Sequence, residues 1–209
     1  MADALTKLSN VYGCDKSDRK HRYTKKYHMY FVKGRYRKFN MLEFGFGKGN
    51  SVKMWMDYFT KANLVTVDIM KKLPKDKLIH KHVKSGRFEF VSADQIDMDK
   101  VLPIFEKHGE FDLIIDDASH VAEDQQYTFA KTFEYVKPGG YYVIEDLKCR
   151  RKHSTRFECQ SDKTLNILNN FLKTGIFDSK ILNDYDKLFI SKNIESVEIY
   201  DKIAFIKKR

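Results

Sequence analysis

Two short apolar runs in the sequence each end on acidic residues. Residues 111–120 read FDLIIDDASH, and residues 141–146 read YYVIED. Buried parallel strands appear as continuous apolar runs, and their carboxyl ends share one edge of an open α/β sheet. The carboxylates and the imidazole at these ends belong to Asp117, His120, Glu145 and Asp146. Carboxylate oxygens suit Mg²⁺ and a neutral imidazole can accept a proton, so the pattern indicates a cation site beside a general base.

Structural roles for the same residues stay open at this point. Asp116 and Asp117 could cap a following helix, and His120 could be a satisfied polar residue on its first turn. Glu145 and Asp146 could instead pair with the basic residues that follow them. Asp116 is the most ambiguous member, because it could orient the ligands from behind or touch a cofactor.

Three glycines at alternate positions predict a second site on the same edge. Gly45, Gly47 and Gly49 follow the apolar residues of a predicted strand and precede a predicted helix. Glycine lets the backbone turn sharply and lets a ligand approach it closely. Asp68 ends the next predicted strand, where its carboxylate could accept both hydroxyls of a ribose. The glycine pattern alone also fits ordinary loops and dinucleotide sites.

Two further acids, together with the glycine pattern, indicate a specific cofactor. With Glu43 in the first strand and Asp94 after the third, the segment resembles the S-adenosylmethionine site of class I methyltransferases. The resemblance implies that the glycines, Glu43, Asp68, Asp94 and Asp116 form the cofactor site, with Asp68 on the ribose and Asp94 near the adenine. A helix cap is the alternative for Asp94, and a nicotinamide cofactor is the main rival ligand. The acid ending the third strand and the Lys-Pro-Gly-Gly turn at residues 137–140 favour the methyl donor.

The acidic strand ends resemble a narrower group within that class. Residues 111–120, residues 142–147 and the opening segment at residues 12–27 are similar to the macrocin O-methyltransferases, which methylate sugar hydroxyls. The similarity runs from about residue 10 to the end, with Cys14 where the group commonly has threonine. It implies Mg²⁺ or Mn²⁺ bound by Asp117, Glu145 and Asp146, with His120 as the base.

The implied chemistry is also reasonable from first principles. A sugar hydroxyl has a very high pKa and is a poor nucleophile, so a divalent cation at its oxygen and a nearby imidazole would both assist its attack on the sulfonium methyl. The acceptor is expected to be a sugar in a glycan or glycosylated metabolite, such as a deoxyhexose like rhamnose. Lys16, His21 and Tyr23 of the opening segment could close over the cofactor or acceptor, or form an aromatic, basic surface helix.

Strands alternating with helices must position these residues. The sequence predicts a Rossmann-like class I methyltransferase fold: a central seven-stranded, mostly parallel sheet with an antiparallel C-terminal hairpin and helices on both faces. Residues 1–38 are expected to be a helical lead-in packed on a methyltransferase domain at residues 39–209, in a single domain overall. The predicted strands lie at residues 40–44, 64–68, 87–94, 111–116 and 141–144, with two short strands within 196–206. The predicted helices lie at residues 51–60, 99–108, 123–136 and 163–173.

Composition bears on the location of the protein and does not identify its partner. The odd number of cysteines, three, predicts free thiols, and the apolar runs are too short to span a membrane. Without a signal peptide the chain is expected to be intracellular and cytoplasmic. The net charge of +10 suggests an anionic partner such as nucleic acid or a carrier-linked sugar, or only a lysine-rich surface. An RNA ribose methyltransferase, a catechol-type enzyme and a non-catalytic binding module are the alternatives. The short chain is also compatible with one domain of a larger glycan-building enzyme.

Overall fold

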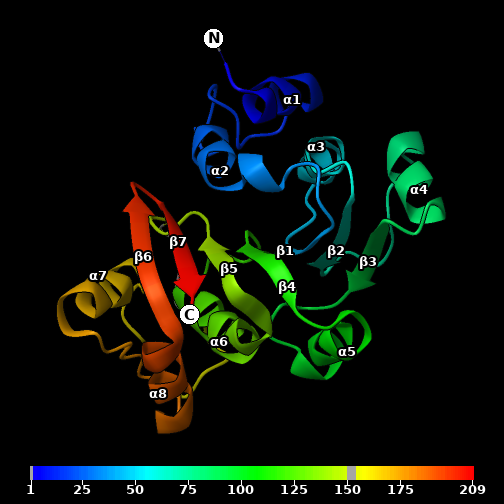
Figure 1. The fold of residues 1–209 in the computed structure, drawn as a ribbon. Helices are drawn as coiled ribbons and strands as arrows, with labels where there is room; N and C mark the ends of the chain where they lie inside the picture. Colours follow the sequence, from blue (N-terminus) through cyan, green and yellow to red (C-terminus); the bar gives the residue numbers. More distant parts are fainter. Residues whose placement is uncertain (1, 150–153) are drawn as a thin grey trace.

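A seven-stranded sheet forms the centre of the computed structural model, which describes residues 2–149 and 154–209 (Figure 1). The strand order is β3-β2-β1-β4-β5-β7-β6; the first five strands are parallel, and β7 is antiparallel to both of its neighbours. The strands are β1 (Phe39–Phe44), β2 (Ala62–Asp68), β3 (Phe88–Ser92), β4 (Phe111–Asp116), β5 (Val136–Ile144), β6 (Ile194–Tyr200) and β7 (Ile203–Lys208). The predicted fold class is therefore confirmed.

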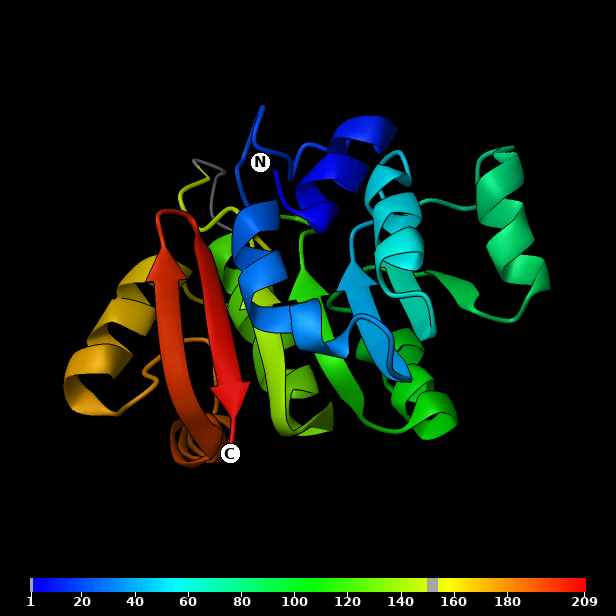
Figure 2. The ribbon, with the colours of Figure 1, turned by 45° about the horizontal axis from the view of Figure 1, so that its top comes forward.

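Helices cover both faces of the sheet (Figure 1, Figure 2). One face carries α1 (Ala4–Tyr12), α2 (Thr24–Phe31), α3 (Asn50–Tyr58) and α4 (Lys77–Lys84), and the other carries α5 (Met98–His108), α6 (Ala122–Thr132), α7 (Thr164–Thr174) and α8 (Asp184–Asn193). Successive strand residues point to opposite faces. In β1, Leu42 and Phe44 enter the core under α5 to α8, while Met41 enters the core under α1 to α4. None of the described helices is both long and apolar enough to cross a membrane.

The elements differ from the predictions in three places. Residues 137–140 were predicted as a turn before a strand, but they lie within β5, where the pairing with β4 shifts register between Phe111 and Leu113. Helix α4 was not predicted, because its sequence KLIHKHVK has few apolar positions and buries only Ile79 and His82. Helix α8 was also missed, since only Asp186 and Ile190 of its ten residues are buried.

The functional edge of the sheet lies where the strand order reverses. Strands β1 and β4 are neighbours, but the chain leaves β1 toward β2 and reaches β4 only after β3. Open α/β sheets bind ligands in the crevice at such a point. Backbone hydrogen bonds continue past the strand ends here, from Asp117 N to the Phe44 carbonyl at 2.9 Å and from Glu145 N to the Asp116 carbonyl at 2.9 Å. The loops that carry the acids are therefore fixed to one another.

Candidate active site

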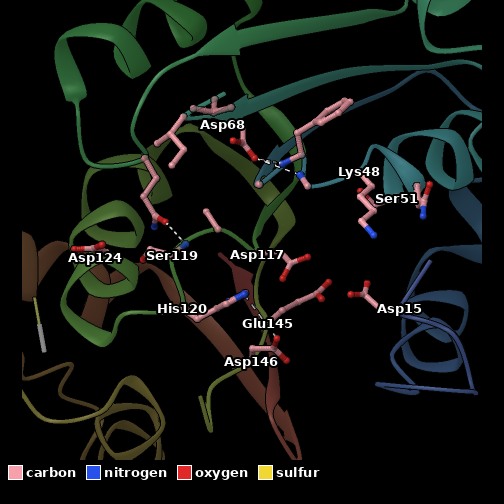
Figure 3. Close-up of a pocket in the computed structure, with 18 of the residues that line it drawn as sticks. Asp15, Lys48, Ser51, Asp68, Asp117, Ser119, His120, Asp124, Glu145 and Asp146 are labelled. Atoms are coloured by element: carbon pink, nitrogen blue, oxygen red, sulfur yellow. Dashed lines mark hydrogen bonds and ion pairs between the residues drawn. The ribbon is translucent and has the colours of Figure 1, made fainter. Parts of the chain in front are cut away.

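One pocket of about 760 Å³ lies along this edge (Figure 3). Its walls come from the loops after β1, β2, β3, β4 and β5 and from the segment between α1 and α2. The predicted site residues among its lining are His21, Gly45, Gly47, Asp68, Asp94, Asp117, His120, Glu145 and Asp146. Figure 3 shows Asp117, His120, Glu145 and Asp146 gathered together, with Asp68 farther away beside the loop after β1. The two predicted sites thus share one cavity.

The glycine loop needs glycine for two different reasons. Gly45 has φ +98°, and a Cβ there would lie 2.2 Å from the carbonyl oxygen of Asp117. Gly49 has φ +73°, and a Cβ there would meet Phe46 and Ile79 at 2.6 Å. Gly45 therefore lets the loops after β1 and β4 touch, whereas Gly49 serves the packing at the start of α3 and does not line the pocket.

Asp68 fixes the glycine loop from the end of β2. Its Oδ2 accepts hydrogen bonds from the backbone of Phe46 at 2.8 Å and Gly47 at 3.3 Å, and its Oδ1 accepts one from Met70 N at 2.9 Å. A carboxylate held by backbone N–H groups is pre-oriented. Because Asp68 also lines the pocket, it stands where a cofactor that touches the glycine loop would meet a negative charge.

A polar group beyond Asp68 lines the pocket at the ends of β3 and β4. The Gln95 side chain accepts from Ser119 N at 2.8 Å and donates to Thr128 Oγ1 at 3.0 Å, so it ties the loop after β3 to the loop after β4. Asp94 does not cap α5, whose N-cap is Asp97. It pairs instead with Arg156 at 3.0 Å.

Asp124 stands out in the same wall. Its side chain is only 2% exposed, and its Oδ1 has no hydrogen-bond partner among the described residues. Its other carboxylate oxygen lies 3.5 Å from Arg156 Nη1. Sequence reasoning missed Gln95, Asp124 and Arg156, because no local motif marks them. An unsatisfied buried acceptor in a pocket wall is suited to a ligand that donates a hydrogen bond.

The acids and the imidazole converge at the ends of β4 and β5. One ligand atom each of Asp117, His120 and Asp146 lies within 4.8 Å of the others, a spacing that one metal ion could bridge. All three side chains are partly exposed to the pocket, at 24%, 18% and 21%. His120 and Asp146 both adopt a left-handed backbone, with φ of 55° and 53°. Non-glycine residues rarely adopt this conformation, and it is concentrated at functional sites.

The helix-capping alternatives do not describe this arrangement. Helix α6 begins at Ala122 with Val121 as its N-cap, and no side chain caps it, so neither Asp116 nor Asp117 has that role. The His120 ring has Nε2 3.9 Å from Asp146 Oδ2, while Nδ1 has no hydrogen-bond partner among the described residues. Because Nδ1 is also buried, Nε2 is the ring nitrogen that can meet a ligand in the pocket.

Glu145 is placed differently from its two acidic neighbours. It is 2% exposed, with Oε1 accepting a 2.6 Å hydrogen bond from Tyr27 and Oε2 lying 2.9 Å from the Lys16 ammonium. Each oxygen thus already has one partner. Of the three acids predicted to hold a cation, Asp117 and Asp146 present their oxygens most openly, whereas Glu145 lies behind them and is not in the group that lies within 4.8 Å.

Several predicted residues lie behind the pocket wall rather than in it. Glu43 is fully buried and accepts from Ser51 at 2.8 Å and from Trp55 at 3.1 Å. Asp116 is fully buried, and burial raises its pKa to about 7. Lys16 and Tyr23 are 1% and 3% exposed and contact the acids, so neither side chain is placed to touch an acceptor. The three cysteines are free, as predicted.

The fold and the pocket define the class of this protein. A parallel sheet with an antiparallel hairpin, a glycine loop after β1 and an acid at the end of β2 are the features of a class I methyltransferase. The methyltransferase domain family matches residues 42–147, and the chain belongs to this family. The resemblance found in the acidic motifs is therefore confirmed at the level of the family.

The similar curated proteins are O-methyltransferases by name, and one of them is named for a rhamnosyl compound. A tetracenomycin-C rhamnosyl 3'-O-methyltransferase of Streptomyces olivaceus is 35% identical over 150 residues, covering 68% of this chain and 36% of that protein. Mycinamicin VI 2''-O-methyltransferase of Micromonospora griseorubida is 29% identical over 218 residues, covering 98% and 52%. Demethylmacrocin O-methyltransferase of Streptomyces fradiae is 33% identical over 150 residues, covering 68% and 36%. The chain spans about half the length of these relatives or less.

A solved structure is similar over the whole chain. The MycE methyltransferase of the mycinamycin biosynthetic pathway, in complex with Mg, SAH and mycinamycin VI, superposes with a TM-score of 0.78 at 29% identity. The match covers 99% of this chain and 55% of that one. The similarity thus includes the segment before residue 42, which the family match leaves out.

Proposed function

We propose that this chain transfers a methyl group from S-adenosylmethionine to a sugar hydroxyl, with a divalent cation at the acidic end of the pocket. The observation that carries the proposal is the convergence of Asp117, His120 and Asp146 within 4.8 Å in the cavity that also holds the glycine loop and Asp68. Donor, cation and base would then meet in one crevice. The sugar class is supported by relatives whose names contain a rhamnosyl or olivosyl group.

The cofactor would lie along the loop ends of β1 to β4. Asp68 is placed for the ribose hydroxyls, because its carboxylate faces the pocket beside the glycine loop. Asp94, Gln95 and the unsatisfied oxygen of Asp124 line the wall beyond it, where the adenine would lie. The similar MycE structures hold SAH, which supports this assignment of the pocket.

The acidic end would hold Mg²⁺ through Asp117 and Asp146, with Glu145 behind them. A bound divalent cation would lower the pKa of the sugar hydroxyl and stabilise negative charge on its oxygen. His120 would take the hydroxyl proton as the oxygen attacks the methyl carbon, while the carbon–sulfur bond breaks and S-adenosylhomocysteine leaves. Asp146, 3.9 Å from His120 Nε2, would stabilise the resulting imidazolium.

The acceptor proposed is a deoxyhexose such as rhamnose on a glycan or a glycosylated metabolite. His21 lines the pocket near Asp146, at 3.8 Å, and marks the side from which the sugar would enter. The relatives are about twice as long as this chain. In a protein of that length, residues outside the 209 of this chain would supply further contacts to the acceptor, including those to the carrier of a carrier-linked sugar.

Labelled S-adenosylmethionine offered with rhamnosides, glycosylated macrolides, catechol or RNA tests the proposal. We expect transfer to a glycoside hydroxyl that stops in EDTA and returns with Mg²⁺. His120→Ala should bind S-adenosylhomocysteine normally and lose about 100-fold or more in rate. His108→Ala is the matched control, because His108 pairs with Glu89 outside the pocket. Full activity in EDTA would contradict the role of the cation. Transfer only to RNA or catechol would contradict the sugar acceptor, and no binding of S-adenosylhomocysteine would favour a binding module.

A further inference from the structure

A lysine is buried among the acids of the site. Lys16 is 1% exposed, and its ammonium lies 2.5 Å from Asp117, 2.9 Å from Glu145 and 3.6 Å from Glu43. Three carboxylates therefore surround the buried ammonium of Lys16.

The segment that carries Lys16 is built to hold it there. The Lys16 carbonyl accepts hydrogen bonds from Tyr23 N at 2.9 Å and Thr24 N at 3.0 Å, at the start of α2. The same segment supplies two hydroxyls to the acids, Tyr23 to Asp146 and Tyr27 to Glu145, both at 2.6 Å. These contacts span more than 100 residues of sequence. The segment from Lys16 to Tyr27 thus forms the polar back wall of the acidic site.

The charges of this cluster are unequal. Three carboxylates, those of Glu43, Asp117 and Glu145, lie around a single ammonium. Two of them, Glu43 and Glu145, are almost fully buried, and a buried charge without a partner is strongly unfavourable. A divalent cation bound at Asp117 would share that carboxylate with Lys16 and would be repelled by its ammonium. The Lys16 ammonium therefore stabilises the buried carboxylates, and it also reduces the net negative charge that would attract a metal ion.

We propose that Lys16 is a positioning residue that acts as the resident counter-ion of the acidic site. It holds one oxygen each of Asp117 and Glu145 before a divalent cation binds, and it weakens the binding of that cation. The proposal rests on the cation site proposed above. It differs from an acceptor-binding role, because the Lys16 side chain does not line the pocket.

Lys16→Met tests this with thermal unfolding and Mn²⁺ binding followed by electron paramagnetic resonance. In EDTA the variant should lose on the order of 10 °C in Tm, because two buried acids lose their cation. Added Mg²⁺ should then raise its Tm more than it raises that of the unmodified protein. The Mn²⁺ Kd should fall by about tenfold, because the repelling ammonium is gone. An equal Mg²⁺ response in the two proteins, or weaker Mn²⁺ binding by the variant, would overturn the proposal.

Two matched controls separate charge from structure. Tyr27→Phe removes a hydrogen bond to the same Glu145 without changing the charge. It should lower Tm, and it should leave the Mn²⁺ Kd unchanged or raise it. Lys25→Met removes a charge from α2 at an exposed side chain outside the pocket, and it should change neither quantity. If Lys16→Met loses no more Tm in EDTA than Lys25→Met, the counter-ion role is wrong.

A charge-balanced variant covers the case in which Lys16→Met does not fold. Lys16→Met combined with Glu43→Gln removes one cation and one buried anion together, so it should fold and bind Mn²⁺ with the Kd of the unmodified protein. A double variant that is no more stable than Lys16→Met, or that differs tenfold from the unmodified protein in Mn²⁺ Kd, would overturn the proposal. If the unmodified protein binds no Mn²⁺, the proposal of a cation site is wrong. The Tm comparison in EDTA would still test the proposal that Lys16 is the counter-ion of the buried acids.

Discussion

Tyr23 and Asp146 are 123 residues apart in the sequence, yet the Tyr23 hydroxyl donates a 2.6 Å hydrogen bond to Asp146 Oδ1. Burial alone would raise the pKa of Asp146, but this hydrogen bond and two nearby imidazoles outweigh it and hold that pKa below its usual value. Asp146 is thereby kept as a carboxylate in a fixed orientation. The opening segment, which lies outside the family match at residues 42–147, therefore completes the site.

Tyr23→Phe should weaken the site through Asp146. Without the hydroxyl, the carboxylate loses the partner that orients it, and groups that orient metal ligands typically contribute 10- to 100-fold to affinity or activity. We expect the Mn²⁺ Kd to rise at least tenfold and the methyl-transfer rate to fall, while the Kd for S-adenosylhomocysteine changes little. Metal titration, cofactor calorimetry and the transfer assay measure the three quantities.

Tyr30→Phe is the control for that substitution. Tyr30 lies on α2 and shares a 2.8 Å hydrogen bond with Tyr200, away from the pocket. Its loss should lower stability by about 1 kcal/mol and leave Mn²⁺ binding unchanged. Equal effects of the two variants on Mn²⁺ binding would mean that Tyr23 acts only through the packing of α2.

Gly45→Ala should disrupt the contact between the two site loops. The new Cβ would lie 2.2 Å from the Asp117 carbonyl oxygen, at a backbone φ of +98°. The loop after β1 or the loop after β4 must move, so we expect a loss of about 2–4 kcal/mol in unfolding free energy together with weaker binding of both cofactor and metal ion. Gly47→Ala has no atom within 4 Å of its Cβ and should lose only about 1–2 kcal/mol from its positive φ. Urea unfolding and calorimetry compare the two, and equal losses would contradict the steric argument.

Much of the fold was predictable because its main signals are local. Strand β4 has the apolar run Leu113 to Ile115 directly before Asp116, and β2 likewise ends on an acid, Asp68. Strand ends of this kind place their acids on one edge without any knowledge of tertiary contacts. The prediction that Asp117, His120 and Asp146 lie together follows from this rule, and the structure places them within reach of one ion.

The remaining features depend on contacts that no local pattern marks. Lys16 was predicted either to close over the cofactor or acceptor or to lie on a surface helix. Only its contacts with Asp117 and Glu145, more than 100 positions further along the chain, show that it is buried among acids. Helix α4 is only eight residues long and buries two of them, so its apolar face is well defined but short. The Lys-Pro-Gly-Gly sequence has the composition of a turn, but the residues before and after it, Val136 and Tyr141, both pair with β4. The four residues therefore lie within β5.

Asp68→Asn should weaken cofactor binding. Asparagine keeps one acceptor oxygen but loses the negative charge and cannot accept from both the glycine loop and Met70 as the carboxylate does. Hydrogen bonds to charged groups contribute about 1.5–3 kcal/mol, so we expect the Kd for S-adenosylhomocysteine to rise about 10- to 100-fold. Asp97→Asn is the control, because Asp97 pairs with Lys100 outside the pocket. An unchanged Kd in Asp68→Asn would mean that this carboxylate serves only the loop.

Stability should fall as the pH drops below about 6.5, partly because of His82. Burial, assisted by the positive charge of Arg87, lowers the pKa of His82, which is 7% exposed and whose Nε2 has no hydrogen-bond partner among the described residues. The unfolded chain then takes up a proton at a higher pH than the folded chain does. This histidine therefore favours unfolding increasingly as the pH falls through its ordinary value toward its lower folded value. Above that window it has no such effect.

His82→Gln removes the proton uptake without introducing a charge. In urea unfolding with EDTA, the difference in unfolding free energy between pH 7.5 and pH 5.5 should be smaller in this variant than in the unmodified protein. His80→Gln, on the same helix but at an exposed position, should leave the difference unchanged. The physical reason is that only the buried imidazole must shed its proton to fold. A pH dependence in His82→Gln equal to that of the unmodified protein would show that other groups account for the acid sensitivity.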